Sequence, residues 1–212
     1  MFTRKLNNKE LAMIRDMVSF VKQKHAHTEG HDYSHVLEVT RYAIKIAEAI
    51  PEVSDPFTVI VGALFHDIGR VINGADVMHG LVGATIAEEY FECIGLDPDK
   101  IVKITNVITA HSPTSMIPQK TIEEKIVYDA DAIDRLGWIG VMRGIMSKKG
   151  SIEEILERTL KKRSEDFYKM HFEASRELGK ELHVQSDIVI KGLRKALDER
   201  IQEIEHLNLP IE

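Results

Sequence analysis

Apolar residues recur at three- and four-residue steps along almost the whole chain, which is the spacing of one face of an α-helix. No alternation of apolar and polar residues longer than a few positions predicts a β-strand, and we find neither an internal repeat nor a low-complexity segment. The sequence therefore predicts an all-α protein. The apolar stripes nearest the two ends are Leu11, Ile14, Val18 and Val21, and Ile190, Leu193, Leu197, Ile201 and Ile204.

Four short signals mark the starts of predicted helices. Asp55-Pro56 and Asp97-Pro98 each combine a capping carboxylate with a proline, whose fixed φ suits the first helical position. Thr121-x-x-Glu124 and Ser151-x-x-Glu154 have the spacing of a capping box, in which two side chains bond backbone N–H groups reciprocally. These signals predict four of the helices independently of the apolar pattern.

Composition and charge exclude several classes of protein. The chain of 212 residues is 43% hydrophobic and 29% charged, so it can bury a core and is not disordered. Its single cysteine, Cys93, excludes an internal disulfide and a thiolate metal cluster. A net charge of −6 without a dense basic block argues against nucleic acid as a partner. We also see no export signal and no apolar run long enough for a membrane span, so we expect a cytoplasmic protein.

We expect one domain over residues 1–212, because no shift in composition marks a boundary. Within it we expect a helical bundle from about residue 20 to about residue 145, followed by charged C-terminal helices from about residue 150 to about residue 208. The apolar stripe between Ile190 and Ile204 is compatible with covering the bundle and with building a homodimer.

Histidine and aspartate residues gather in four separated segments that one metal centre can collect. The ordered series His35, His66-Asp67 and Asp131 places two imidazoles and two carboxylates on three predicted helices, and these are donors that divalent metal ions accept. The four segments are Gly30–His35, Leu64–Gly69, His111 and Asp129–Asp134.

Each of these residues also has an ordinary structural explanation. His35 shares an apolar stripe with Val39 and Ile46, as buried structural histidines do. Asp67 can pair with Arg70, and Asp131 with Arg135 at the favourable i, i+4 spacing. However, the segments around both aspartates are apolar, where a carboxylate is costly to bury unless a cation accompanies it.

The order His, His-Asp, Asp, with Ile68-Gly69 after the pair, resembles the HD-domain superfamily of metal-dependent phosphohydrolases. The similarity extends over roughly residues 20 to 145. The opening Gly30–His35 and the later Asp129–Gly140 resemble a branch of small, single-domain bacterial and archaeal members, some of which hydrolyse nucleoside triphosphates or other nucleotides. The resemblance implies that the metal ligands are His35, His66, Asp67 and Asp131.

Two more histidines, His79 and His111, fall between the His-Asp pair and the last aspartate. In binuclear members of the superfamily, two histidines in this interval hold a second metal, with the aspartate of the pair as a bridge. The alternative is that both line the pocket and contact substrate phosphates. His31, four residues before His35, is expected to be a proton donor or a support for a ligand, unless it is only a loop residue.

The mechanism implied by the resemblance gives these side chains roles. Asp67 or Asp131 orients the attacking water, and His31 or His111 protonates the leaving group. Three basic residues are expected to contact phosphate, or else to form exposed salt bridges: Arg70, Lys120 and Arg135.

We therefore expect a phosphohydrolase that holds one or two divalent ions (Mn, Fe, Co, Ni, Zn or Mg) and acts on a small phosphorylated substrate, most readily a nucleotide. Two alternatives remain open: a di-iron oxygenase, because some members of the superfamily use a six-ligand version of the site, and a nucleotide-binding regulator with a structural ion.

Overall fold

The computed structural model describes residues 1–27, 30–72, 78–112, 116–146 and 148–206, and most of them are helical. Within these residues the only β-type pairing is an isolated bridge between Phe2 and Ser54, so the predicted all-α class is confirmed. The main helices are α1 (Asn8–Lys24), α2 (Tyr33–Ala49), α3 (Pro56–Phe65), α4 (His79–Cys93), α5 (Pro98–Ala110), α6 (Ile122–Asp134), α7 (Gly137–Met146), α8 (Ile152–Glu154), α9 (Lys161–Glu165) and α10 (Glu173–Glu205). Shorter turns are η1 (His25–His27), η2 (Ile68–Val71), the π-helical η5 (Ile155–Leu160) and η6 (Asp166–Lys169).

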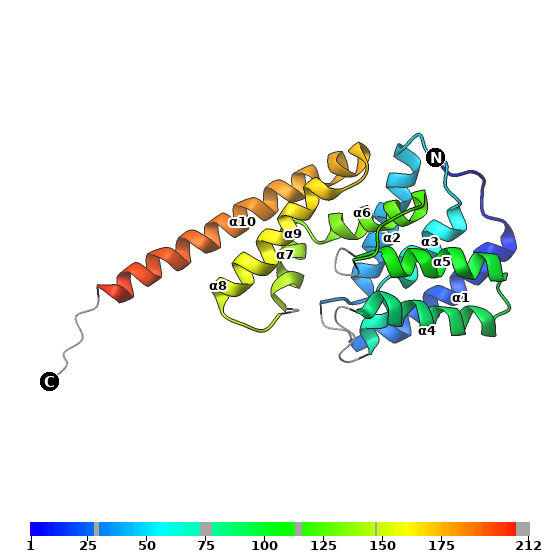
Figure 1. Cartoon of the computed structure of the whole chain (residues 1–212), viewed down its shortest axis with the longest axis horizontal. Helices are drawn as coiled ribbons and strands as arrows, with labels where there is room; N and C mark the ends of the chain where they lie inside the picture. The colour runs from blue at the N-terminus through cyan, green and yellow to red at the C-terminus, as the bar shows by residue number, and fades with distance from the viewer. Residues whose placement is uncertain (28–29, 73–77, 113–115, 147, 207–212) are drawn as a thin grey trace.

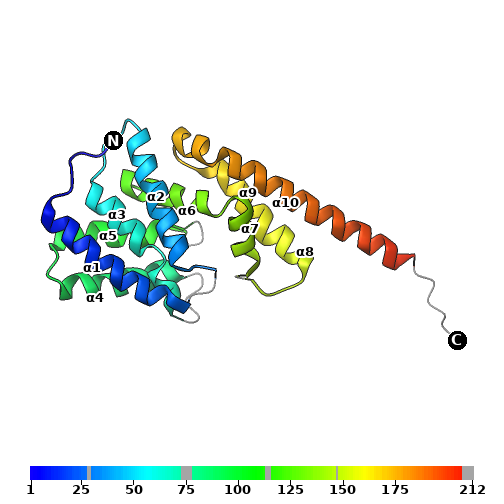
Figure 2. The same ribbon diagram turned by 180° about the vertical axis from the view of Figure 1, so that it is seen from behind.

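The helices form a bundle and an elongated part that extends from it. Helices α1 to α6 gather into the bundle, and α7 to α10 form the elongated part, as the two opposite views agree (Figures 1 and 2). The end of α10 projects beyond every other helix (Figure 1). Residues 207 and 208 of the expected C-terminal extension lie outside the described residues.

The predicted helix starts are confirmed by their hydrogen bonds. The Asp55 side chain accepts from the backbone N–H of Thr58 at 2.9 Å, and Asp97 caps α5 in the same way. Thr121 and Ser151 each open a reciprocal capping box with the glutamate three residues later. Local chemistry therefore fixes where α3, α5, α6 and α8 begin.

Helix α3 is apolar all round because it is buried on all sides, with neighbours in α1, α2, α5 and α6. Two apolar cores meet at this helix: one joins it to α2 and α6, and the other joins it to α1, α4 and α5. The chain that leaves α3 at Phe65 therefore carries the next residues, His66 and Asp67, into the interior of the bundle. None of the helices in the described residues has the length and apolar character needed to span a membrane.

A third, smaller core lies outside the bundle. It consists of Val141, Leu156 and Leu160, with Val189 and Leu197 of α10 packed against it. The interpretation of the chain as one domain stays a prediction.

The first apolar stripe is only partly right, since Leu11 is exposed. In the first turn of α1 the inward position belongs to Glu10, which points Leu11 about 100° away around the helix. The buried carboxylate of Glu10 accepts hydrogen bonds from Arg4 at 2.7 and 2.8 Å and from Lys100 at 2.9 Å. Hydrogen bonding to Arg4 lowers the pKa of Glu10 to about 2.

Replacing Glu10 with glutamine should destabilise the protein by roughly 2 kcal/mol at neutral pH, because the ionised carboxylate is worth more in the folded than in the unfolded state. Since the hydrogen bonds from Arg4 and Lys100 lower the folded pKa of Glu10, this difference should be complete above pH 5 and disappear as the pH falls from about 5 to about 2. Urea unfolding of both proteins across this range measures it. The exposed Glu92→Gln variant is the control, and a pH-independent difference for Glu10→Gln contradicts the assignment.

Candidate metal centre

Helix ends position two of the imidazoles. His66 and His111 follow directly after the last residues of α3 and α5. Each ring turns back and donates its Nδ1–H to a carbonyl three residues earlier, that of Ala63 at 2.7 Å and that of Ile108 at 2.6 Å. Because a carbonyl can only accept, both rings carry their proton on Nδ1 and present a lone pair at Nε2.

His35 is fixed in the same way by a carboxylate. Its Nδ1 donates to Oδ2 of Asp134 at 2.6 Å, and both side chains are buried. Its Nε2 therefore also points away from its own support, and it lies 3.1 Å from Nε2 of His66. Two lone pairs at this distance repel each other unless a positive charge lies between them.

The donors around His35 and His66 have the spacing of ligands on one ion. Oδ2 of Asp67 lies 3.4 Å from Nε2 of His35 and 3.6 Å from Nε2 of His66, and Oδ1 of Asp131 lies 3.5 Å from Nε2 of His35. Two donors that are each about 2.1 Å from a metal ion are roughly 3.0–3.5 Å apart. These four residues, which the resemblance implied as ligands, therefore fit a divalent ion.

The other oxygen of Asp67 faces His79 and His111. Oδ1 lies 3.4 Å from Nε2 of each ring, and the two Nε2 atoms are 3.2 Å apart. The guanidinium of Arg70 also reaches this group, with Nε 3.0 Å from Oδ1 of Asp67 and Nη2 3.3 Å from Nε2 of His79. A fixed positive charge thus lies where the resemblance allowed a second metal.

The carboxylates around His35 stabilise positive charge at this point. Although burial opposes a charged ring, hydrogen bonds to Asp134 and Asp67 raise the pKa of His35 to about 10. Burial also disfavours the ionised carboxylate of Asp131, yet Arg135 and His35 lower its pKa to about 2. A pocket that favours ionised carboxylates and attracts a proton to an imidazole is one that also favours a metal cation.

His31 lies at the edge of the site. Its Nδ1 donates to Oδ2 of Asp67 at 2.6 Å, and burial lowers the pKa of His31 to about 4, so the ring is neutral at pH 7. The polar neighbours of His25 in the sequence predict a surface position, yet this residue is buried and donates from Nδ1 to the carbonyl of His31 at 2.8 Å. That prediction was wrong because a hydrogen bond to a residue six positions further along the chain holds the ring in the interior.

The three aspartates of α6 make different contacts. Asp131 faces the metal donors and Asp134 holds His35, whereas Asp129 accepts from the backbone N–H groups of His171 and Phe172 just before α10. The sequence grouped these residues without separating their roles, and it missed Asp134 as a support for a ligand.

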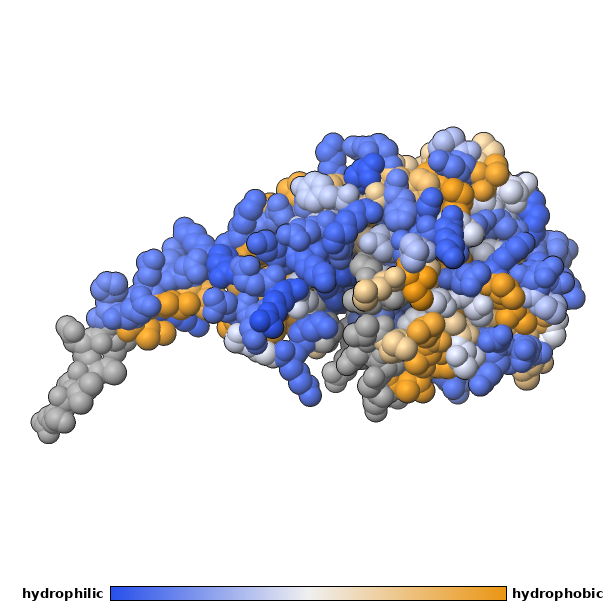
Figure 3. Space-filling view, viewed as in Figure 1, coloured by the Kyte–Doolittle hydropathy of each residue, from blue (hydrophilic) through white to orange (hydrophobic). Residues whose placement is uncertain are grey.

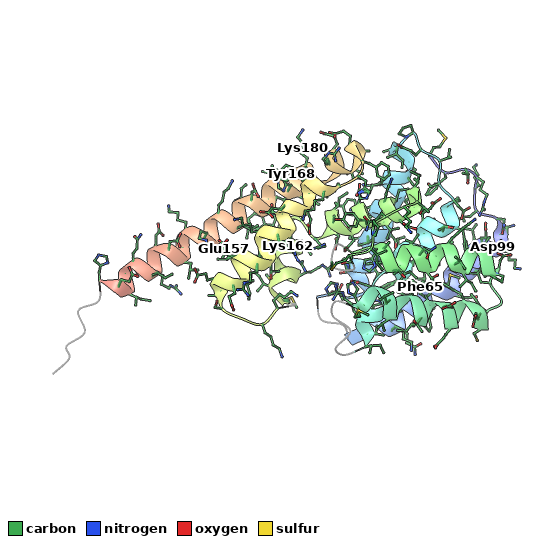
Figure 4. The ribbon with its side chains drawn as sticks, viewed as in Figure 1. Phe65, Asp99, Glu157, Lys162, Tyr168 and Lys180 are labelled. Carbon is green, nitrogen blue, oxygen red and sulfur yellow. The ribbon has the colours of Figure 1, made fainter. Side chains whose placement is uncertain are left out.

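A cavity of about 530 Å³ opens beside the metal donors. Asp67, Asp131 and His31 form one side of it. The other side is formed by the helical segment from α8 through η5 to α9 (residues 152–165), which we call the strut. Four acidic side chains line it, against the following basic ones: Arg70, Arg135, Lys148, Lys149, Arg158, Lys162 and Arg163. Figure 4 labels Lys162 on α9. Seven cations against four carboxylates make this a positively charged cavity in an acidic protein.

Two of the three basic residues that we expected at phosphate, Arg70 and Arg135, line this cavity. Lys120 does not; it is exposed, and its backbone N–H bonds to Glu124 within the capping box of α6. The basic residues of the strut were not expected there. Their i, i+4 spacing at Arg158 and Lys162 is the sequence signal that puts them on one helix face.

Arg143 of α7 connects the elongated part to the metal donors. Its Nη1 donates to Asp32 at 3.0 Å and its Nη2 to Ser34 at 2.8 Å, in the first turn of α2. Its Nε lies 3.8 Å from Oδ2 of Asp134, the oxygen that holds His35.

The chain is similar to one protein family model, to a bacterial relative and to solved structures of the same fold. Residues 32–136 match the family model described as HD domain. YpgQ of Bacillus subtilis is 30% identical over 125 residues, which cover 56% of this chain and 58% of YpgQ, so the match spans less than two thirds of that relative. A crystal structure of YpgQ in complex with ADP superposes with a TM-score of 0.65 at 22% identity, covering 86% of this chain and 96% of that chain. An HD-superfamily hydrolase of Bacillus thuringiensis gives a TM-score of 0.66 at 21% identity, covering 89% and 98%.

Changing Asp134 to asparagine should weaken the binding of Mn²⁺ by about 10- to 100-fold, because the imidazole of His35 loses the charge that orients it and strengthens it as a donor. Isothermal titration calorimetry measures the affinity. Asp16→Asn, on the exposed side of α1, should bind Mn²⁺ as the unchanged protein does. Equal affinities for all three proteins would show that Asp134 does not support the ligand.

Proposed function

Because the chain belongs to the HD-domain superfamily, we propose that it is a metal-dependent phosphohydrolase that acts on a nucleotide or a related small phosphate ester. One observation carries the proposal: His35, His66, Asp67 and Asp131 lie close together beside a cavity that the two aspartates line and whose other walls are rich in cations. Metal donors beside fixed positive charge are what hydrolysis of a phosphate ester needs.

In this proposal His35, His66, Asp67 and Asp131 would hold one divalent ion. Bound there, it would act as a Lewis acid and lower the pKa of a water molecule at the site. Beside His79 and His111, Arg70 provides the positive charge that the second ion supplies in binuclear members. The mixture of imidazole and carboxylate donors accepts Mn, Fe, Co, Ni, Zn or Mg.

The substrate class follows from the cavity. A volume of about 530 Å³ lies within the usual range for small-molecule sites. Its excess of arginine and lysine selects for anions, since these side chains form strong hydrogen bonds with phosphate oxygens. The ADP bound by YpgQ, a protein of the same fold, favours a nucleotide over other phosphate esters.

His31 is suited to move a proton in the reaction. At neutral pH its ring donates Nδ1–H to Asp67 and keeps a lone pair at Nε2, so it can accept the proton of the attacking water. Asp67, 2.6 Å away, then stabilises the imidazolium, which can pass the proton to the leaving group. The Nε2 of His111 points at Asp67 instead, which favours a role at the metal side over that of a general acid.

Asp67→Ala should abolish turnover and metal retention together, because Asp67 contacts both groups of donors. Phosphate release from a panel of nucleotides with Mn²⁺ or Mg²⁺, combined with elemental analysis, tests this. Asp99→Ala, at an exposed position of α5 far from the site (Figure 4), should keep both activity and one ion per chain. An Asp67→Ala protein with normal rates and a full metal content removes the basis of the proposal.

A double substitution, Arg158→Ala with Lys162→Ala, should raise KM for a nucleotide about tenfold and leave Mn²⁺ affinity unchanged, because both side chains line the cavity without touching the metal donors. Steady-state kinetics and calorimetry separate the two effects. Lys120→Ala, an exposed lysine outside the cavity, should leave KM unchanged.

The nucleotide panel and the metal analysis also distinguish the phosphohydrolase from the two alternatives, the di-iron oxygenase and the nucleotide-binding regulator. Bound iron with a visible absorption band, and no phosphate released from any nucleotide, would favour the di-iron oxygenase. Tight nucleotide binding without turnover under any metal would favour the regulator.

A further inference from the structure

The cations that line the cavity differ in what stabilises their charge. Water solvates the exposed ones, and Figure 3 shows a predominantly hydrophilic surface over the strut; the exposed cations are Lys148, Lys149, Arg158 and Lys162. Arg70 is paired with the carboxylate of Asp67 at 3.0 Å, and Arg135 with that of Asp166 at 3.1 Å. Among the described residues that line the cavity, Arg163 on α9 is the cation that has neither support.

Arg163 is partly buried and forms no ion pair with a carboxylate of the described residues. The carboxylate of Asp166 is already engaged by Arg135 at 3.1 Å and by Lys169 at 2.8 Å. In the described part of the chain, the acceptor for Arg163 is the carbonyl of Gly140, 3.2 Å from Nη1. Because a charge that leaves water without a counter-ion is costly, this guanidinium favours an anion from elsewhere.

Helix α7 leaves room for the guanidinium at Gly144. A Cβ atom at this position would lie 3.2 Å from Nη1 of Arg163 and 2.9 Å from Cδ2 of Leu160. Glycine therefore lets the strut approach α7 and brings Nη1 to the carbonyl of Gly140. A guanidinium has further N–H groups in the same plane. Those of Arg163 have no acceptor among the described residues, so they are available to a ligand in the cavity that Arg163 lines.

The surroundings of Arg163 make its charge less favourable than in water. Burial and the like charges of Arg135 and Arg70 lower the pKa of Arg163 to about 10, so the side chain is charged at pH 7 but poorly stabilised. Asp131 acts in the opposite direction, which puts this metal donor within electrostatic reach of Arg163. An anion bound by Arg163 therefore lies in the same cavity as the metal donors.

We propose that Arg163 binds a phosphoryl group of the substrate, which is the counter-ion that the described part of the chain does not provide. This rests on the proposed function, because it assigns the main phosphate-binding residue of the same site. Two N–H groups of a guanidinium match two oxygens of a phosphate, and this geometry is one that lysine cannot reproduce. Arg163 therefore contributes more to affinity than the exposed lysines of the cavity.

Calorimetric titration with methylene-bridged ADP, which resists hydrolysis at the bridge, tests the assignment in the presence of Mn²⁺. Arg163→Met should raise the dissociation constant about 100-fold, because it removes a charge-assisted pair of hydrogen bonds. Arg163→Lys should raise it about tenfold, since it keeps the charge but not the planar fork. Lys161→Met, which removes an exposed cation of α9 outside the cavity, should have no effect. Equal affinities for all four proteins would overturn the proposal, as would an unchanged protein that does not bind the analogue.

Thermal unfolding without nucleotide separates binding from a structural role. Arg163→Met should raise the unfolding midpoint by about 2–4 °C, because it removes a charge that lacks a counter-ion. Mn²⁺ should bind this variant no more weakly than it binds the unchanged protein. A lower midpoint together with weaker Mn²⁺ binding would show that Arg163 supports the fold instead, and would overturn the proposal.

The readouts also separate this proposal from the proposed function. An unchanged protein that binds the analogue through Arg163 but releases no phosphate from any nucleotide would contradict the phosphohydrolase and support the role of Arg163. Hydrolysis with the same KM for the unchanged protein and Arg163→Met would support the phosphohydrolase and overturn the role of Arg163.

Discussion

The hydrogen bonds on the far side of three imidazoles determine what the centre of this molecule can be. Ala63, Ile108 and Asp134 accept the Nδ1 protons of His66, His111 and His35, so the three Nε2 lone pairs are directed to a shared interior. There they meet both oxygens of Asp67. Lone pairs and buried carboxylates gathered in this way are unfavourable without a cation. The fold therefore holds a group of donors whose stability depends on positive charge.

Helix packing explains how such polar residues reach the interior. Because α3 is enclosed by four other helices, the residues that follow it, His66 and Asp67, are buried by the path of the chain and not by their own preference. The end of α5 supplies His111 in the same manner, by a ring that turns back onto its own helix. Burying these polar side chains costs desolvation free energy. The ion pair of Asp67 with Arg70 and the contacts among the buried donors offset part of this cost.

Sequence patterns predicted what depends on neighbours in the chain. The caps at Asp55 and Thr121 and the helical class follow from local chemistry and are confirmed. The order of histidines and aspartates identified residues that the structure brings together, although their binding of a metal stays a prediction. The pattern could not separate Asp134 from Asp129 or find Lys162 in the cavity and Lys120 outside it, because those differences arise only when distant helices meet. His25 was misjudged for the same reason.

Arg143 has a consequence for how the two parts of the molecule communicate. It fastens α7 to the first turn of α2, one turn from His35, and approaches the carboxylate that steadies that ring. An interaction that holds His35 in place therefore also helps to hold α7, and the strut that follows α7, in position against α2. A cation bound beside His35 would therefore favour this position of the strut, and by thermodynamic reciprocity the strut in this position would favour binding of the cation to the same extent.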